Sequence, residues 1–126
     1  MTETAPDAKR KIASLTIWVL IAAETLMMGA AGASKFFATE MWTGLFTDWG
    51  YPVWFAFVVG IAEVMGALLL LFPKLASYAA GFLGVIMLGA VGTLLTHTND
   101  LGLKTPLLHL VVLAIILTAR WSRRLR

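Results

Sequence analysis

The sequence predicts an all-α integral membrane protein: an antiparallel four-helix bundle with a short amphipathic interfacial helix between helices 1 and 2. Two observations support this fold class. Of the 126 residues, 60% are hydrophobic and 13% are charged, whereas soluble domains carry about 25% charged residues. The apolar residues also form four long runs, and a helix needs about 20 such residues to cross the hydrocarbon core of a bilayer. The runs are 12–33, 52–72, 75–96 and 106–119 with Trp121.

The first run follows a basic cluster, Lys9-Arg10-Lys11, and so resembles the start of a secretory signal. However, the apolar part of a signal peptide has only about 7 to 15 residues, and this run is longer and contains Glu24. We therefore interpret it as a membrane span that is retained. Residues 1–8, which include Pro6 and two acids, are expected to be a disordered cytoplasmic tail. Residues 9–126 then form one four-transmembrane-helix domain.

The segment between the first two runs has a helical pattern of its own. Trp42, Leu45, Phe46 and Trp49 follow i, i+3, i+4, i+7 spacing, and polar residues take the other side. This pattern predicts a short amphipathic helix at the membrane interface, where tryptophan is enriched. Two interpretations stay open: an aromatic anchor with no role in binding, or an interfacial lid of Trp42, Phe46 and Trp49 over a lipophilic ligand.

Small residues are frequent in the first and third runs. The first run ends in Gly29-Ala30-Ala31-Gly32-Ala33, and Ser77, Gly81, Gly89 and Thr93 recur at intervals of four or eight residues in the third. Because helices in lipid gain little from hydrophobicity when they associate, they use small residues for close approach. The pattern predicts a compact bundle.

The distribution of basic residues and the absence of cysteine exclude several functions. Basic residues gather near both termini, which is typical of topology signals, so no nucleic acid partner is expected. With four spans, the terminal side carries eight Lys or Arg residues against Lys35 and Lys104 on the other side. The positive-inside rule then predicts that both termini are cytoplasmic.

The chain has no cysteine, which excludes disulfides, thiolate metal sites and a thiol relay within it.

Two acidic residues lie in the middle of predicted spans. Glu63 is 11 residues past Pro52, and Glu24 is 11 residues before Lys35, so both lie about 16 Å along a helix, near the midplane. Ionisable groups at that depth normally face the bundle interior or a cavity and find a partner. Lys35 shares a helix face with Glu24 but is too far along the helix for a direct ion pair with it.

Three interpretations of these acids stay open. The two carboxylates could form a hydrogen-bonded structural pair that shares one proton and fixes the helix register. One of them could instead handle protons beside a bound quinone or another lipophilic ligand. In the third interpretation, each acid is solitary and bonds to backbone or hydroxyl groups.

Two histidines, His97 and His109, flank the segment between the third and fourth runs. A turn there could bring both imidazoles to one volume near the outer surface, together with Asn99, Asp100 and Lys104. The commonest role for such histidines is to cap helix ends or bond the backbone. Hydrogen bonding to a quinone carbonyl and ligation of a b-type haem are the alternatives.

Four motifs make the chain similar to the DoxX family of small bacterial membrane proteins, in its DoxX-like branch, over roughly residues 15–117. These motifs are GASKFF (32–37), WGYPVW (49–54), GIAEVMGALLLLFP (60–73) and GVIMLGAVGTLLTH (84–97). The resemblance implies a four-helix bundle in the bacterial cytoplasmic (inner) membrane. It also implies a redox setting, because the family's namesake is associated with thiosulfate oxidation coupled to quinone. Lys35, Glu63 and His97 match family motif positions, whereas Glu24 and His109 do not.

We expect a membrane subunit of a redox-associated system that contacts quinone or anchors a soluble oxidoreductase. The alternatives are a structural or assembly subunit with no chemistry of its own, and a small carrier for a lipophilic or weakly acidic solute. Expected partners are the lipid bilayer and either a protein partner or a second copy of the chain. Quinone is the candidate cofactor, haem is disfavoured, and no metal site is predicted. Whether the chain is an enzyme stays open, because its chemistry would need a partner subunit.

Overall fold

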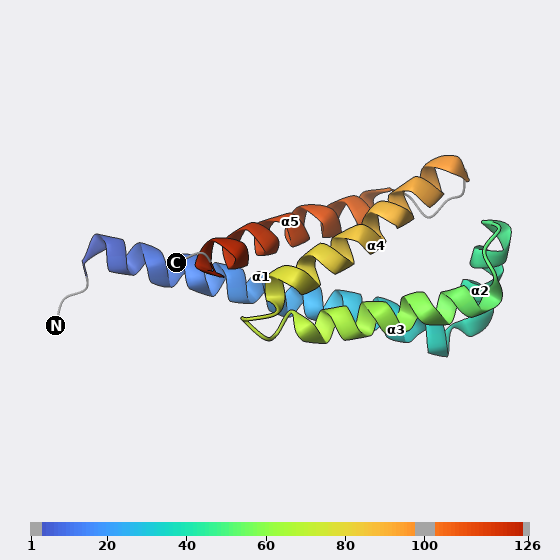
Figure 1. Cartoon of the computed structure of the whole chain (residues 1–126), viewed down its shortest axis with the longest axis horizontal. Helices are drawn as coiled ribbons and strands as arrows, with labels where there is room; N and C mark the ends of the chain where they lie inside the picture. Colours follow the sequence, from blue (N-terminus) through green and yellow to red (C-terminus); the bar gives the residue numbers. More distant parts are fainter. Residues whose placement is uncertain (1–3, 98–102, 125–126) are drawn as a thin grey trace.

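A computed structural model describes residues 4–97 and 103–124, and this part of the chain is entirely helical apart from its connections (Figure 1). The predicted all-α class is confirmed. The helices are α1 (Ala5–Phe37), α2 (Thr39–Asp48), α3 (Val53–Leu69), α4 (Ala76–Thr96) and α5 (Lys104–Arg124).

Helix α1 begins earlier than the sequence pattern indicated. The side chain of Thr4 accepts a hydrogen bond from the Asp7 backbone N–H, and Pro6 lies at the start of the helix. An N-cap threonine, an early proline and an acid in the first turn all favour a helix start. The segment expected to be a tail, 1–8, is therefore helical from Ala5 onward, and its residues 1–3 lie outside the described part.

Three helices, α1, α4 and α5, are each long and apolar enough to cross a membrane. Helix α3 has 17 residues and forms a pair with α2, bent by 116°, that provides a fourth candidate span. The predicted second span, 52–72, ends at Leu69 because the chain turns around Pro73, which lacks an N–H and disfavours helix before it. The chain is a multi-pass membrane protein.

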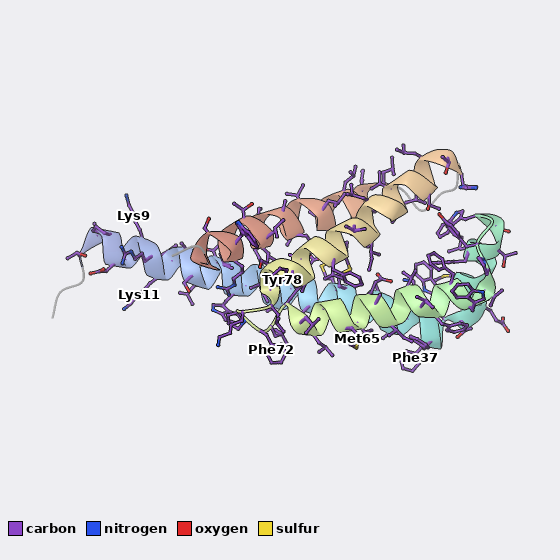
Figure 2. All side chains as sticks on the ribbon, in the orientation of Figure 1. Lys9, Lys11, Phe37, Met65, Phe72 and Tyr78 are labelled. Atoms are coloured by element: carbon purple, nitrogen blue, oxygen red, sulfur yellow. The ribbon has the colours of Figure 1, made fainter. Side chains whose placement is uncertain are left out.

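The outer surface of the bundle suits lipid. Large apolar side chains such as Phe37, Met65, Phe72 and Tyr78 point away from the helices (Figure 2) and are at least half exposed. No hydrophobic effect drives such residues inward when the surrounding medium is itself apolar. This surface therefore agrees with a protein surrounded by acyl chains.

The helices form two antiparallel pairs. Helix α1 packs along α3, and α4 packs along α5, while contacts between the pairs are fewer. The pairs meet near the turn between α3 and α4 and diverge toward α2, which gives the bundle a wedge shape (Figure 1). Helix α5 is also attached to α1 through Arg120, whose guanidinium carbon lies 4.8 Å from the Trp18 ring centroid.

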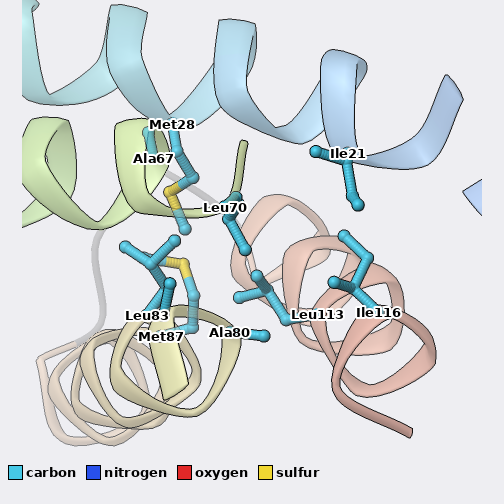
Figure 3. Close-up of a cluster of buried hydrophobic side chains, with 10 residues drawn as sticks. Ile21, Met28, Ala67, Leu70, Ala80, Leu83, Met87, Leu113 and Ile116 are labelled. Carbon is cyan, nitrogen blue, oxygen red and sulfur yellow. The ribbon is translucent and has the colours of Figure 1, made fainter. Parts of the chain in front are cut away.

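The narrow end of the wedge holds the apolar core (Figure 3). The core residues are at most 2% exposed and come from α1, the C-cap of α3, α4 and α5: Ile21, Leu70, Leu83, Leu113 and Ile116. Close packing of this kind leaves few voids larger than a water molecule. The core joins the two helix pairs and closes this end of the bundle.

A glycine contact sets the distance between α1 and α3. A Cβ atom added to Gly32 would lie 2.6 Å from the Gly60 carbonyl oxygen, and one added to Gly60 would lie 2.9 Å from the Gly32 oxygen. The predicted use of small residues for close approach is therefore confirmed at the end of the first run. It is wrong for the glycines of the third run, because a Cβ atom at Gly81 or Gly89 would meet nothing within 4 Å.

This contrast predicts opposite effects of two glycine substitutions. We expect Gly32→Ala to lower the thermal stability in detergent, because the added methyl group must push α1 and α3 apart. The matched control, Gly81→Ala in the interior of α4, should be neutral or stabilising by about 0.5–1 kcal/mol, since alanine is the better helix former. Equal melting temperatures for the two variants would contradict the assigned helix contact.

Candidate functional site

A cavity of about 470 Å³ lies between the two helix pairs. All five helices contribute to its wall, and most of the lining side chains are aliphatic or aromatic. The ionisable side chains among the lining residues are Lys35, Tyr51, Glu63 and His109. An apolar cavity with a few convergent polar groups is the usual form of a small-molecule site.

Lys35 and Glu63 form a buried ion pair in the cavity wall. The Lys35 Nζ lies 2.6 Å from the Glu63 Oε1, and the two residues are 4% and 3% exposed. The structure therefore brings two of the predicted site residues, Lys35 and Glu63, into direct contact. The sequence did not predict this ion pair, because the length of the helix separated Lys35 from the level of the two acids.

Helix geometry explains why Lys35 reaches Glu63. Side chains on a helix point back toward its N-terminus, so the lysine stem runs along α1 toward the bilayer interior, and its Nζ lies 3.5 Å from the Ala31 carbonyl oxygen. The adjacent contact of Gly32 with Gly60 brings the two backbones close enough for the charges to meet. The packing of α1 against α3 therefore places the Lys35 ammonium next to the Glu63 carboxylate.

Helix α2 covers the ion pair. The Lys35 Nζ lies 4.0 Å from the centroid of the Trp42 ring, a cation–π contact. The Trp42 Nε1 donates a hydrogen bond of 3.0 Å to the Ser34 Oγ, which fixes the ring over the lysine. The predicted short helix is confirmed, and its first tryptophan contacts a polar site residue rather than only anchoring the chain.

Glu24 and His109 form a second buried pair. The His109 Nδ1 bonds the Glu24 Oε1, with the two residues 5% and 2% exposed. His109 lines the cavity and Glu24 lies behind it. The proposed sharing of a proton between the two carboxylates is wrong, because Glu24 faces α5 whereas Glu63 faces α1. Each acid has a basic partner instead, so neither is solitary.

His97 does not join His109 at the cavity. Its Nδ1 lies 3.1 Å from the Thr93 carbonyl oxygen and 3.0 Å from the Thr96 Oγ1, at the end of its own helix. The capping interpretation is confirmed for His97, and the predicted convergence of two imidazoles is wrong. Asn99 and Asp100 lie outside the described residues. Within those residues, no three His, Cys, Asp or Glu side chains gather as metal ligands.

An aromatic cluster closes the cavity beside α2. Phe46 is 5% exposed, and its ring centroid lies 5.4–6.5 Å from those of Trp42, Trp49, Tyr51 and Phe55. The Trp49 Nε1 is buried and has no hydrogen-bond acceptor among the described residues. Because a buried N–H without an acceptor is costly, this donor is suited to an oxygen atom brought by a ligand.

A hydrogen bond joins the α2–α3 corner to α4. Thr93 donates to the Gly89 carbonyl oxygen at 2.8 Å, so the Tyr51 hydroxyl donates to the Thr93 Oγ1 at 2.7 Å. The corner turns at Gly50, whose φ of 88° favours glycine. Sequence analysis did not identify Tyr51 and Thr93 as a pair. The only sequence signal was a hydroxyl in an apolar run, which does not reveal its partner.

Residues 19–118 match the DoxX-like family, which confirms the resemblance found in the sequence motifs. The matched range includes the cavity and both of its polar pairs. No curated protein and no solved structure gives a significant match to the chain.

We predict that Glu63→Gln lowers stability by about 3–5 kcal/mol, because it leaves the Lys35 charge buried without a counter-charge. The double variant Lys35→Met, Glu63→Leu should recover most of the loss, since apolar residues of similar volume often replace buried ion pairs without cost. Thermal unfolding in detergent measures both effects. Glu40→Gln, at an exposed position, is the control, and a Glu63→Gln protein as stable as this control would argue against the buried pair.

Proposed function

The chain belongs to the DoxX-like family of membrane proteins, and from this premise we propose that it is the membrane component of a redox system and binds a quinone-like molecule in the cavity beneath α2. One observation carries the proposal. An ion pair between Lys35 and Glu63 is buried in the wall of an otherwise apolar cavity. The redox setting and the quinone come from the family resemblance, and the cavity supports them.

The ion pair is better explained by ligand binding than by stability. Removing two charges from water costs several kcal/mol, so a buried salt bridge is weak evidence for a stabilising role. Ionisable groups inside a membrane usually mark a functional site. The Lys35 ammonium has three N–H donors, of which Glu63 occupies one direction, so a ligand carbonyl oxygen can take another.

The remaining wall suits the ring of a quinone. The cavity volume of about 470 Å³ lies within the range of about 300–1,000 Å³ that is usual for ligand sites. Trp42, Phe46 and Trp49 offer flat apolar surfaces, and the Trp49 N–H is a buried donor in need of an acceptor. A quinone brings both a flat ring and oxygen acceptors, so these residues fit it. In this proposal α2 acts as the interfacial lid.

The basic residues near the termini support an orientation with both termini in the cytoplasm, in the bacterial inner membrane. The cavity and α2 then lie toward the outer side. The chain has no cysteine and therefore no thiol redox group of its own. We propose that a protein partner supplies the electrons. We propose that residues 9–126 act as one domain in such a complex.

The carrier alternative finds less support in the structure. A carrier must expose its site to each side in turn, yet Ile21, Leu70, Leu113 and Ile116 close the narrow end of the wedge. The alternative role as an assembly subunit would not use the polar pairs of the cavity wall.

Tryptophan fluorescence tests the proposal, because quinones quench nearby tryptophans and Trp42 and Trp49 line the cavity. We expect a decyl-substituted benzoquinone to quench the detergent-solubilised protein in a saturable manner. The Lys35→Met, Glu63→Leu variant should bind at least about tenfold more weakly, equivalent to losing about 1.4 kcal/mol.

Two tryptophan variants locate the quenching. Trp49→Phe should lose much of the saturable signal, whereas Trp54→Phe, at a position 63% exposed and outside the cavity wall, should retain it. Quenching that rises linearly with quinone concentration, or that is unchanged in the double variant, would show partitioning into the detergent and refute the site.

A further inference from the structure

The Glu24/His109 pair is arranged differently from the ion pair across the cavity. His109 borders the cavity, whereas Glu24 lies behind it and is 2% exposed. The carboxylate bonds the Nδ1 of the imidazole. The ring nitrogen on the far side, Nε2, is therefore the polar atom that His109 offers to a ligand.

The bond to Glu24 decides which form the imidazole takes. A carboxylate accepts hydrogen bonds, so the proton of a neutral His109 resides on Nδ1 and Nε2 is left as an acceptor. In the imidazolium form both nitrogens are donors. The Nε2 atom of a neutral imidazole can thus accept a hydrogen bond from a ligand hydroxyl. In the imidazolium form, the same atom can donate a hydrogen bond to a ligand carbonyl.

We propose that His109 is the residue through which the cavity exchanges a proton with its ligand, and that Glu24 is a positioning residue that fixes the orientation of the imidazole. The inference rests on the proposed function and narrows the ligand class. The ligand carries an oxygen that exists as a carbonyl in one form and as a hydroxyl in another. Reduction of a quinone to the hydroquinone takes two electrons, which the redox partner of the proposed function supplies, and two protons. His109 supplies one proton from Nε2 to one oxygen, and the electron pair of the broken N–H bond stays on Nε2, while the second oxygen takes its proton from water. Oxidation of the hydroquinone returns the electrons to the partner and one proton to Nε2.

The charged groups around His109 are few. Glu24 of α1 bonds it directly, and Glu63 of α3, paired with Lys35, lies within electrostatic range. The α4 residues that line the cavity carry no acid or base. On α5 itself, the exposed Lys104 lies about one and a half turns earlier. Tyr51, at the α2–α3 corner, is the other ionisable side chain of the cavity wall. The test must separate His109 from these neighbours.

The test measures proton uptake when a decyl-substituted benzoquinone and its hydroquinone bind the detergent-solubilised chain under anaerobic conditions. Calorimetric titrations in buffers of different ionisation enthalpy give the number of protons taken up or released. We expect uptake with the quinone, whose carbonyl needs the imidazolium, and release with the hydroquinone. Because the proposed uptake consumes a proton, quinone affinity should rise as the pH falls, by up to about tenfold per unit.

Variants assign these protons to the Glu24/His109 pair. His109→Gln keeps an amide that can bond Glu24 but cannot titrate, so we expect both proton counts to fall to zero. Glu24→Ala should lower the proton counts, because it removes the acceptor that orients the imidazole, and Glu24→Gln, which keeps a side-chain oxygen acceptor, should restore part of them. The matched control is His97→Gln, since His97 bonds its own helix end and does not line the cavity, and it should keep the wild-type proton counts.

The outcomes separate this inference from the proposed function. Absence of saturable binding of either probe to the wild-type chain would overturn both. If the probes bind, and binding is weakened by Lys35→Met, Glu63→Leu, unchanged proton counts in His109→Gln would overturn the role of His109 alone. Proton counts of the same sign for quinone and hydroquinone with the wild-type chain would also overturn it, and this result does not depend on any variant folding.

Discussion

The close contact between Gly32 and Gly60 is the constraint on which the rest of the structure depends. Without a Cβ at either position, α1 and α3 approach until each glycine touches the other's backbone, and at that distance Lys35 and Glu63 meet inside the bundle. A charge at this depth must have a partner. By bringing the two helices close together, the glycines help the ammonium and the carboxylate in the cavity wall to neutralise each other.

The wedge shape of the bundle then separates two tasks. At the narrow end, side chains from four helices fill the space and join the helix pairs. At the wide end, the pairs diverge toward α2 (Figure 1), and aromatic side chains of α2 line the cavity between them. The bend of 116° between α2 and α3 is what allows one continuous stretch of chain to provide both a wall and a cover.

The sequence predicted the elements better than the contacts between them. Long apolar runs and helical spacing identify spans and the amphipathic α2, because these signals are local. Periodicity can show that Glu24 and Glu63 face inward, but it cannot say which neighbouring helix each one meets. The pairings with His109 and Lys35 depend on the order of helices around the bundle and on the reach of the lysine stem. Neither property is encoded in a short window of sequence.

The glycines show the same limit. Gly32 and Gly81 both lie in small-residue patterns, yet only Gly32 faces a neighbour, because a pattern records spacing and not what stands opposite.

In the Lys35/Glu63 pair, the ammonium and carboxylate charges sum to zero. Moving a proton from the base to the acid within a pair leaves its total charge unchanged, since a charged pair and a neutral pair both sum to zero. A membrane voltage does work on net charge that moves across the bilayer, by about 2.3 kcal/mol per elementary charge per 100 mV. A proton that moves between Lys35 and Glu63 therefore displaces little net charge, whereas a proton that His109 exchanges would change the total charge of its pair. Of the two pairs in the cavity wall, the Glu24/His109 pair would thus be the one sensitive to membrane voltage.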